Sequence, residues 1–337
     1  MDQFLHTRSS LKSELTEWKE SDAGQFAHKH GFIPAARMRN VDAAEDEELR
    51  RFFLTKLLIE EAQAANPEAV FSTDTPFTLL TEEEFVKFIG ESYQRGSHPL
   101  PETLPAVGVF SNSTISVATE KDWTTSGCVV DVKNQGQCGS CWAFAAVAAL
   151  ESAICLAGEP LVSLSEQQLV DCDKTSYACQ GGYPGDALTF IKRSGGVCKE
   201  QDYPYVSGDT GDRDSCQASS CNMQSVTIRE VVAVPESEIG LVQAISGRPV
   251  AVGVAAGNSS WKQYKGGIVS ACSSKELDHA VLAVGYGGSG SSSYFKIKNS
   301  WGTEWGEAGY MRLKRGAGTG SSGTCGIIGP KSVFPQL

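Results

Sequence analysis

Two cysteines stand three residues apart in the stretch "NQGQCGSCWAF", residues 134–144. Such a CxxC pair can be a redox couple, half of a zinc site, or two sulfurs with unrelated roles. The second of them, Cys141, begins an apolar helix predicted over 140–158. Unpaired N–H groups and the helix dipole favour a thiolate there. Cys141 is therefore a candidate nucleophile, and a zinc site is disfavoured because no second CxxC accompanies the pair.

A thiolate nucleophile needs an imidazole partner. Of five histidines, only His279 lies in the cysteine-bearing part of the chain. A lone histidine is usually structural, but His279 follows a polar loop and begins the β-like run "HAVLAVGYG". Asn299 ends another β run and can accept an imidazole N–H, while Trp301 can shield that bond from water. Gln135 and the backbone N–H of Cys141 can bind the oxygen of an attacked carbonyl.

The elements that must position these residues change character along the chain. Residues 11–95 read as helical, with one helix over 45–66 and another over 80–90, where Thr81 and Glu84 form a capping box. Residues 97–120 read as an exposed linker. Helices are predicted over 140–158, 166–172 (capped by Ser165) and 185–196, whereas short β-branched runs dominate after 226. The sequence thus predicts an α+β protein with two lobes, about 121–225 mainly helical and about 226–337 mainly β.

Composition separates residues 1–120 from the rest. They carry 11 basic and 20 acidic residues, against 18 and 20 in residues 121–337. Neither part is basic, so nucleic-acid binding has no electrostatic support. No apolar run of about 18 residues exists, so no transmembrane helix is predicted. Residues 1–120 form either an independent helical domain or a removable, inhibitory prosegment, whose acidity predicts release on acidification.

Cysteine usage points to an oxidising compartment, because all 11 cysteines lie between Cys128 and Cys325. Asn112 and Asn258 fit the N-glycosylation pattern. The first 20 residues lack the apolar core of a signal peptide. This conflicts with the cysteine count, and removal of a leader would resolve the conflict.

Five stretches resemble motifs of the papain-like cysteine proteases, cathepsin L-like branch, in the family's order. They are "NQGQCGSCWAF", "LSEQQLVDC", "CQGGYPGDAL", "LDHAVLAVGYG" and "KNSWGTEWGEAGYMRLKRG". The resemblance covers about residues 120–337 and implies a two-lobe fold preceded by a helical prosegment. It implies Cys141 as nucleophile, His279 as acid and base, Asn299 as orienter and Gln135 as oxyanion donor. The expected activity is that of a cysteine endopeptidase made as a zymogen, without a cofactor or a metal.

The resemblance also implies a substrate cleft and a specificity pocket for the second residue before the cut. The pocket walls are Tyr183, Pro184, Gly253, Leu277, Ala280 and Pro330, and the further cleft residues are Gly139, Gly181, Gly182, Asp278 and Trp301. No charge occurs among the pocket walls, so a large apolar side chain is expected in the pocket. An endopeptidase rather than a carboxypeptidase is expected, because residues 121–337 contain no second histidine to hold a terminal carboxylate.

The resemblance implies three disulfide bonds, Cys138–Cys179, Cys172–Cys216 and Cys272–Cys325. Cys128, Cys155, Cys198 and Cys221 remain and allow three pairings, among which Cys198–Cys221 is favoured because both flank the loop closed by Cys172–Cys216. In the first third, Glu47, Arg51 and Asn66 stand at the spacing of the family's prosegment helix motif, whereas "TPFTLLTEEEF" lacks the usual Asn and Asp.

The implied partners are protein and peptide substrates, the chain's own prosegment as inhibitor, and cystatin-like inhibitors. The implied state is a monomer that is secreted or lysosomal or vacuolar. The sequence leaves two alternatives: a non-catalytic binding protein on the same fold, and a thiol–disulfide oxidoreductase that uses Cys138 and Cys141. All four catalytic positions are filled, which disfavours the binding protein.

Overall fold

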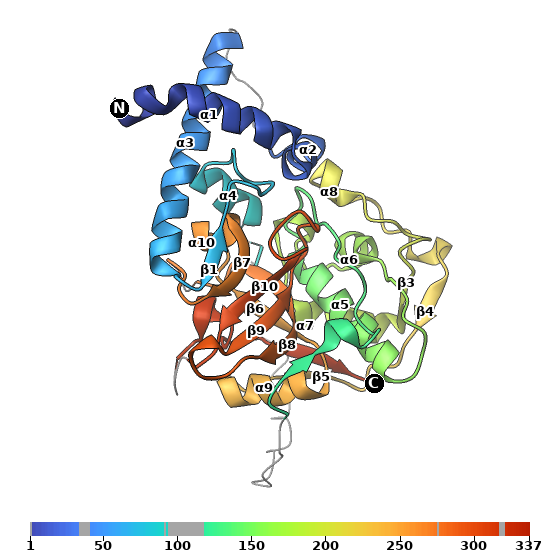
Figure 1. Ribbon diagram of the computed structural model, residues 1–337. Helices are drawn as coiled ribbons and strands as arrows, with labels where there is room; N and C mark the ends of the chain where they lie inside the picture. The colour runs from blue at the N-terminus through green and yellow to red at the C-terminus, as the bar shows by residue number, and fades with distance from the viewer. Residues whose placement is uncertain (1, 34–40, 91, 94–117, 275, 317–320) are drawn as a thin grey trace.

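Helices cover one end of the molecule and one side of a large sheet (Figure 1). The computed structural model describes residues 2–33, 41–90, 92–93, 118–274, 276–316 and 321–337. The predicted linker over 97–120 and the sequon at Asn112 therefore lie almost wholly or wholly outside the described residues. The α-helices are α1 (Asp2–Glu20), α2 (Asp22–Lys29), α3 (Val41–Ala65), α4 (Glu82–Ile89), α5 (Cys141–Leu156), α6 (Glu166–Cys172), α7 (Pro184–Ser194), α8 (Ser207–Thr210), α9 (Glu238–Gly247) and α10 (Ser259–Lys262).

The helix ends follow local signals in the sequence. The Thr81 hydroxyl accepts the Glu84 N–H at 3.1 Å, and the Glu84 carboxylate accepts the Thr81 N–H at 2.9 Å, so the predicted capping box of α4 is confirmed. Ser165 caps α6 as predicted. Helix α7 ends at Gly195, whose φ of +75° suits glycine.

Over the described ranges, nine strands form the main sheet. It runs in the order β1-β7-β10-β9-β8-β6-β11-β5, with β2 paired to β8. Among the described strand pairs of this sheet, only β10 with β7 is parallel. Its strands are β1 (Ala69–Phe71), β2 (Lys121–Asp122), β5 (Glu230–Ala233), β6 (Val250–Val254), β7 (Tyr264–Val269), β8 (His279–Gly287), β9 (Tyr294–Lys298), β10 (Tyr310–Lys314) and β11 (Val333–Gln336). Two more strands, β3 (Gly196–Cys198) and β4 (Met223–Ser225), pair with each other beside the helices.

The first third of the chain is built into this sheet rather than standing apart as an independent domain. Strand β1 pairs antiparallel with β7 at the sheet edge. Just before β1, the Asn66 side-chain oxygen accepts the backbone N–H groups of Ser270 and Ala271 at 2.8 and 2.7 Å. Asn66 is fully buried. The two parts therefore share backbone hydrogen bonds across their contact.

Helix α5 joins the helical and the sheet regions. It packs against β8, β6 and β11 on one side and against α6 and α7 on the other. Of its 16 residues, 12 are buried, because an apolar sequence on all sides suits a helix enclosed by protein. The first residue of this central helix is Cys141. Its position is thereby fixed between the helices and the sheet.

Candidate active site

Cys141 is the only free cysteine, and it is fully buried. Its Sγ accepts the backbone N–H of Ala280 at 3.4 Å and lies 3.7 Å from the hydroxyl oxygen of Ser92, a residue of the first third. Burial raises the pKa of the Cys141 thiol to about 11, outweighing the hydrogen bonds with Ala280 and Ser92, which lower it. In this state Cys141 is a neutral thiol.

His279 lies at the start of β8, in the neighbouring sheet region. Its Nε2 is 2.8 Å from the Asn299 side-chain oxygen, and its ring stacks on Trp301 at a centroid distance of 4.8 Å. The other ring nitrogen, Nδ1, is buried and has no hydrogen-bond partner among the described residues. Burial lowers the pKa of His279 to about 4, although the bond to Asn299 raises it.

These two shifts oppose a thiolate–imidazolium pair. Both groups are fully buried in this structure. Desolvation penalises the charged form of each group. Burial in this structure therefore favours the uncharged forms of the Cys141 and His279 side chains.

Gln135 is buried and held at both ends of its amide. Its Nε2 donates to the Cys138 carbonyl at 3.0 Å, and its Oε1 accepts the Ser300 hydroxyl at 2.7 Å. Its backbone N–H donates to the Ser300 carbonyl at 2.8 Å. Ser300 was not singled out in the sequence, although it directly follows Asn299. Through Ser300, the segment bearing Gln135 is tied to the segment bearing Asn299.

A cluster of aromatic rings surrounds Trp301. Trp305 lies edge-on to it at 5.0 Å, and Trp261 at 6.0 Å, both measured between ring centroids. From the first third, Phe77 and Phe85 cover the same tryptophan at 5.3 and 5.7 Å. The sequence suggested Trp301 as a shield for the His279–Asn299 bond, but gave no sign of these neighbours.

On the other side of Cys141, Tyr93 fills the predicted specificity pocket. Its side chain is only 3% exposed, and its ring meets that of Tyr183 edge-on at 5.0 Å. A Cβ atom added at Gly253 would come within 2.6 Å of the Tyr93 ring and hydroxyl. The Tyr93 hydroxyl lies 3.5 Å from the Pro330 carbonyl oxygen. Three of the six predicted pocket residues thus touch or adjoin one side chain.

The other predicted pocket residues lie nearby but contribute differently. Pro184 begins α7 and is buried, and Ala280 is buried beside Cys141. Leu277 is partly buried, with its Cδ1 3.1 Å from a Cβ placed at Gly329.

Three predicted cleft glycines surround Ser92. The N–H of Gly182 donates to the Ser92 carbonyl at 2.8 Å. A Cβ atom added at Gly181 would lie 2.5 Å from the Ser92 carbonyl oxygen, and one added at Gly139 would lie 3.1 Å from the Ser92 Cβ. These glycines let a chain pass close to Cys141.

The Asp278 carboxylate binds two backbone N–H groups. Its two side-chain oxygens accept the N–H groups of Ala256 and Gly257 at 2.7 and 2.9 Å. Burial raises its pKa to about 6 despite these bonds. Asp278 reaches the first third through its backbone carbonyl, which accepts the Ser92 hydroxyl at 3.2 Å.

Five disulfides account for the other ten cysteines. They are Cys128–Cys155, Cys138–Cys179, Cys172–Cys216, Cys198–Cys221 and Cys272–Cys325. The first and fourth resolve the four cysteines whose pairing the sequence left open. Because Cys138 bonds to Cys179, it does not form a redox couple with Cys141, which weighs against the oxidoreductase alternative.

Asn258 is a poor glycan acceptor in this fold. Its side chain is only 4% exposed, and its amide nitrogen donates to the Ala255 carbonyl at 2.9 Å. A glycan needs this nitrogen in an accessible position. The expectation of glycosylation at Asn258 therefore conflicts with the structure.

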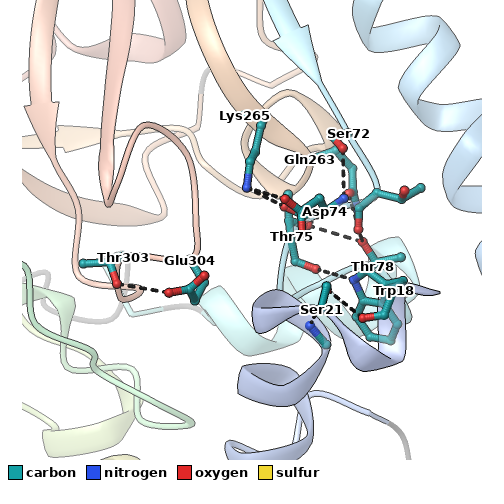
Figure 2. Close-up of polar contacts among 12 residues, drawn as sticks. Trp18, Ser21, Ser72, Asp74, Thr75, Thr78, Gln263, Lys265, Thr303 and Glu304 are labelled. Atoms are coloured by element: carbon teal, nitrogen blue, oxygen red, sulfur yellow. Dashed lines mark hydrogen bonds and ion pairs between the residues drawn. The ribbon is translucent and has the colours of Figure 1, made fainter. Parts of the chain in front are cut away.

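A loop of the first third holds that part onto β7 and its neighbours (Figure 2). The loop residues Thr75 and Thr78 contact the Gln263 side-chain oxygen at 3.1 and 3.4 Å, and Asp74 forms an ion pair of 2.7 Å with Lys265. Behind the loop, Trp18 of α1 donates to the Thr75 carbonyl at 3.2 Å. The loop is thus held between α1 and the sheet.

An ion pair stabilises the first third internally. Arg51 of α3 contacts Glu84 of α4 through two of its nitrogens, and it also pairs with Glu47 one turn away at 2.9 Å. The Arg51 side chain donates to the Leu79 carbonyl as well, at 3.1 Å. Burial alone would raise the Glu84 pKa, but the bonds from Arg51 and the Thr81 N–H outweigh it and lower the pKa.

Cysteine proteases are similar to this chain in sequence. A family model described as papain family cysteine protease matches residues 117–333. The chain is 35% identical to senescence-specific cysteine protease SAG39 of Oryza sativa subsp. indica over 311 residues, covering 91% of this chain and 89% of the rice protein. It is 38% identical to digestive cysteine proteinase 2 of Homarus americanus over 296 residues, covering 85% of this chain and 88% of the lobster protein.

A solved structure matches the first third as well as the rest. The Amb a 11 cysteine protease, a ragweed pollen allergen crystallised in its proform, superposes with a TM-score of 0.81 at 31% identity, covering 100% of this chain and 88% of that chain. The arrangement of the first third over Cys141 is therefore similar to that of a proenzyme.

Proposed function

The chain belongs to the papain family of cysteine proteases, hydrolases of peptide bonds, and we propose that Cys141 is its nucleophile and His279 its general acid and base. The observation that carries this proposal is the arrangement around His279. One ring nitrogen is fixed by Asn299 at 2.8 Å, and the other has no partner among the described residues. The Cys141 sulfur accepts a hydrogen bond from the backbone N–H of Ala280, the residue that follows His279.

In this mechanism the thiolate of Cys141 attacks the substrate carbonyl carbon. The carbonyl oxygen becomes an anion and accepts hydrogen bonds from the side-chain amide of Gln135 and from the backbone N–H of Cys141. His279 then protonates the leaving amine, and an acyl-enzyme remains on Cys141. Water, deprotonated by His279, then hydrolyses this thioester, and the released Cys141 sulfur takes the proton back from His279. Asn299 keeps the imidazole in the orientation that both proton transfers need.

Residues 1–120 act as an inhibitory prosegment and linker, and residues 121–337 as the peptidase, whose helical and β lobes divide near 225. Two features support this division. Ser92 lies beside the Cys141 sulfur and on Gly182, and Tyr93 fills the adjacent pocket. A peptide substrate needs the same space, so these residues must leave before hydrolysis starts.

The pocket for the second residue before the cut prefers a large apolar side chain. Tyr93 stands in for that side chain in the resting state, packed on Tyr183 and Gly253. A guanidinium in this pocket would be buried without a charged partner from the proposed walls, which costs several kcal/mol. The enzyme is thus expected to cut internal bonds that follow Leu, Phe or Tyr at this position.

Partners and compartment are part of the same proposal. Protein and peptide substrates enter the cleft, cystatin-like inhibitors block it, and the enzyme is a monomer. Five disulfides support an oxidising compartment, either outside the cell or in a lysosome or vacuole. No helix in the described ranges is long and apolar enough to cross a membrane.

The test replaces Cys141 and His279 separately with alanine. Each proenzyme is processed with added pepsin, and hydrolysis of a peptide with Leu at the second position before the cut is measured. We expect Cys141→Ala to abolish hydrolysis and His279→Ala to lower kcat at least about 1,000-fold. A matched control is His28→Ala, an exposed histidine of α2 that processing removes. Normal turnover by either active-site variant would refute the assignment.

A further inference from the structure

Lys262, the last residue of α10, is fully buried without a carboxylate partner. Within the described part of the chain, its Nζ has one hydrogen bond, to the Thr55 hydroxyl of α3 at 3.4 Å. Among the described residues no carboxylate lies within ion-pair distance of it. An ammonium group has three donors and normally pairs when buried. The Lys262 ammonium can therefore donate hydrogen bonds to an acceptor that the proenzyme does not supply.

The groups that face Lys262 belong to the prosegment. Thr55 lies on α3, and the charges that act on Lys262 come from Glu82, Glu84 and Arg51 of α4 and α3. Burial lowers the pKa of Lys262 to about 8. Removing the prosegment takes all of these groups away.

Gln263, the next residue, faces the same prosegment surface. Its side-chain oxygen contacts Thr75 and Thr78 (Figure 2). The Thr78 carbonyl also accepts the Thr55 hydroxyl at 2.8 Å. Thr55 thus links the contacts of Lys262 and Gln263. Loss of the prosegment uncovers an ammonium and an amide that are adjacent in sequence.

This surface lies on the leaving-group side of Cys141. The Trp261 ring, one residue before Lys262, is 6.2 Å from the His279 ring and 6.0 Å from Trp301. The prosegment fills the specificity pocket with Tyr93, passes Cys141 at Ser92, and covers Trp301 with earlier residues. A peptide that fills the pocket therefore departs across Trp301, toward Lys262.

We propose that Lys262 forms a carboxylate-binding subsite in the mature enzyme and selects substrates with an acidic group at the second residue after the cut. This rests on the proposed function. The carboxylate comes either from an Asp or Glu side chain or from the end of a peptide. The buried aromatic rings beside the site lower its local dielectric, which strengthens such a pair. Residues 121–337 carry 18 basic against 20 acidic residues, so their overall charge does not favour acidic peptides.

The test uses mature enzyme from the full chain and quenched fluorescent peptides that differ only at the second residue after the cut. Glu, Gln and Lys are compared there in peptides with amidated ends, and one Gln peptide ends in a free carboxylate at that residue. We expect kcat/KM to favour Glu over Gln about threefold to tenfold, and less at high salt. A gain for the free-carboxylate peptide alone assigns the subsite to peptide ends.

Three variants identify the residue responsible. Lys262→Gln should make the Glu and Gln peptides equivalent, and Lys262→Arg should restore the preference. Lys192→Gln, an exposed lysine on α7, should leave it unchanged. Equal cleavage of all peptides by the wild type, or an unaltered preference in Lys262→Gln, would overturn the subsite. The Gln peptide reports catalysis alone, so its hydrolysis in either case leaves the proposed function standing.

Discussion

Replacing Tyr93 with alanine measures how strongly the filled pocket closes the proenzyme. The Tyr93 side chain is 3% exposed and packs on Tyr183 and Gly253. Burial of a large side chain contributes about 1.5–3 kcal/mol, and truncation of a buried aromatic costs about 3–5. We take about 2–4 kcal/mol for a pocket at the molecular surface, which raises the open fraction of proenzyme ~30- to 1,000-fold.

The assay is the rate at which iodoacetamide alkylates Cys141 in intact proenzyme at neutral pH. The other ten cysteines are disulfide-bonded, so one added mass reports one thiol. Cys141 is fully buried, so the reagent reaches it only in the open form. Tyr93→Ala should react faster by the factor given above. Gel electrophoresis checks that the chain remains uncut during the measurement.

Tyr93→Phe is the matched control. It keeps the ring and removes only the hydroxyl, whose contact with the Pro330 carbonyl is 3.5 Å long. A bond of this length contributes little, so the rate should rise less than about threefold. If Tyr93→Ala reacts no faster than the wild type, the pocket is not what keeps the prosegment in place.

Three further outcomes follow from the prosegment contacts. Glu84→Gln removes the ion pair with Arg51, which is fully present above the free carboxyl pKa and is lost as the pH falls through the lowered pKa of Glu84. Autoprocessing of the variant should therefore be faster than that of the wild type near neutral pH and should match it only once the pH lies below that lowered pKa, whereas exposed Glu83→Gln should change nothing. Asn66→Ala leaves two buried backbone N–H groups without an acceptor, at about 1–3 kcal/mol each, and should speed alkylation at neutral pH. Lys262→Met should raise the proenzyme Tm, because burying the charged ammonium destabilises the fold by at most roughly 3 kcal/mol, the value that a pKa drop from 10.5 to about 8 corresponds to. The wild type gains stability as the buried Lys262 deprotonates, so the Tm advantage of the variant should shrink as the pH rises from 8 to 10.5.

The sequence predicted those elements whose signals are local. The capping box at Thr81 and the cap at Ser165 formed as expected, because cap residues act on backbone groups three positions away. Strand β7 was not predicted. Its centre holds Gly266 and Gly267, and its pairing with β1 and β10 decides its conformation. Strand β1 is three residues long and forms only against that distant partner.

In the candidate site too, the residue types were predictable from the sequence, whereas the properties that depend on distant contacts were not. Residue types and motif order were enough to propose Cys141 and His279, and the structure places the Cys141 sulfur on the N–H of Ala280, the residue after His279. Their charge state was not predictable, because it depends on burial beneath residues about 50 to 200 positions earlier. Asn258 illustrates the same limit, since a short sequon carries no information about burial. Contacts between distant segments decided each of these points.

The place of β11 in the sheet constrains the order in which the protein can fold. Residues 333–336 lie between β6 and β5, which precede them by about 80 to 100 residues. During synthesis these two strands emerge long before the strand that must separate them. They cannot pair with each other without occupying its place, so the sheet remains incomplete until residue 336 has left the ribosome. The N-terminal segment emerges first, and it is therefore already present to cover Cys141 when the last strand inserts.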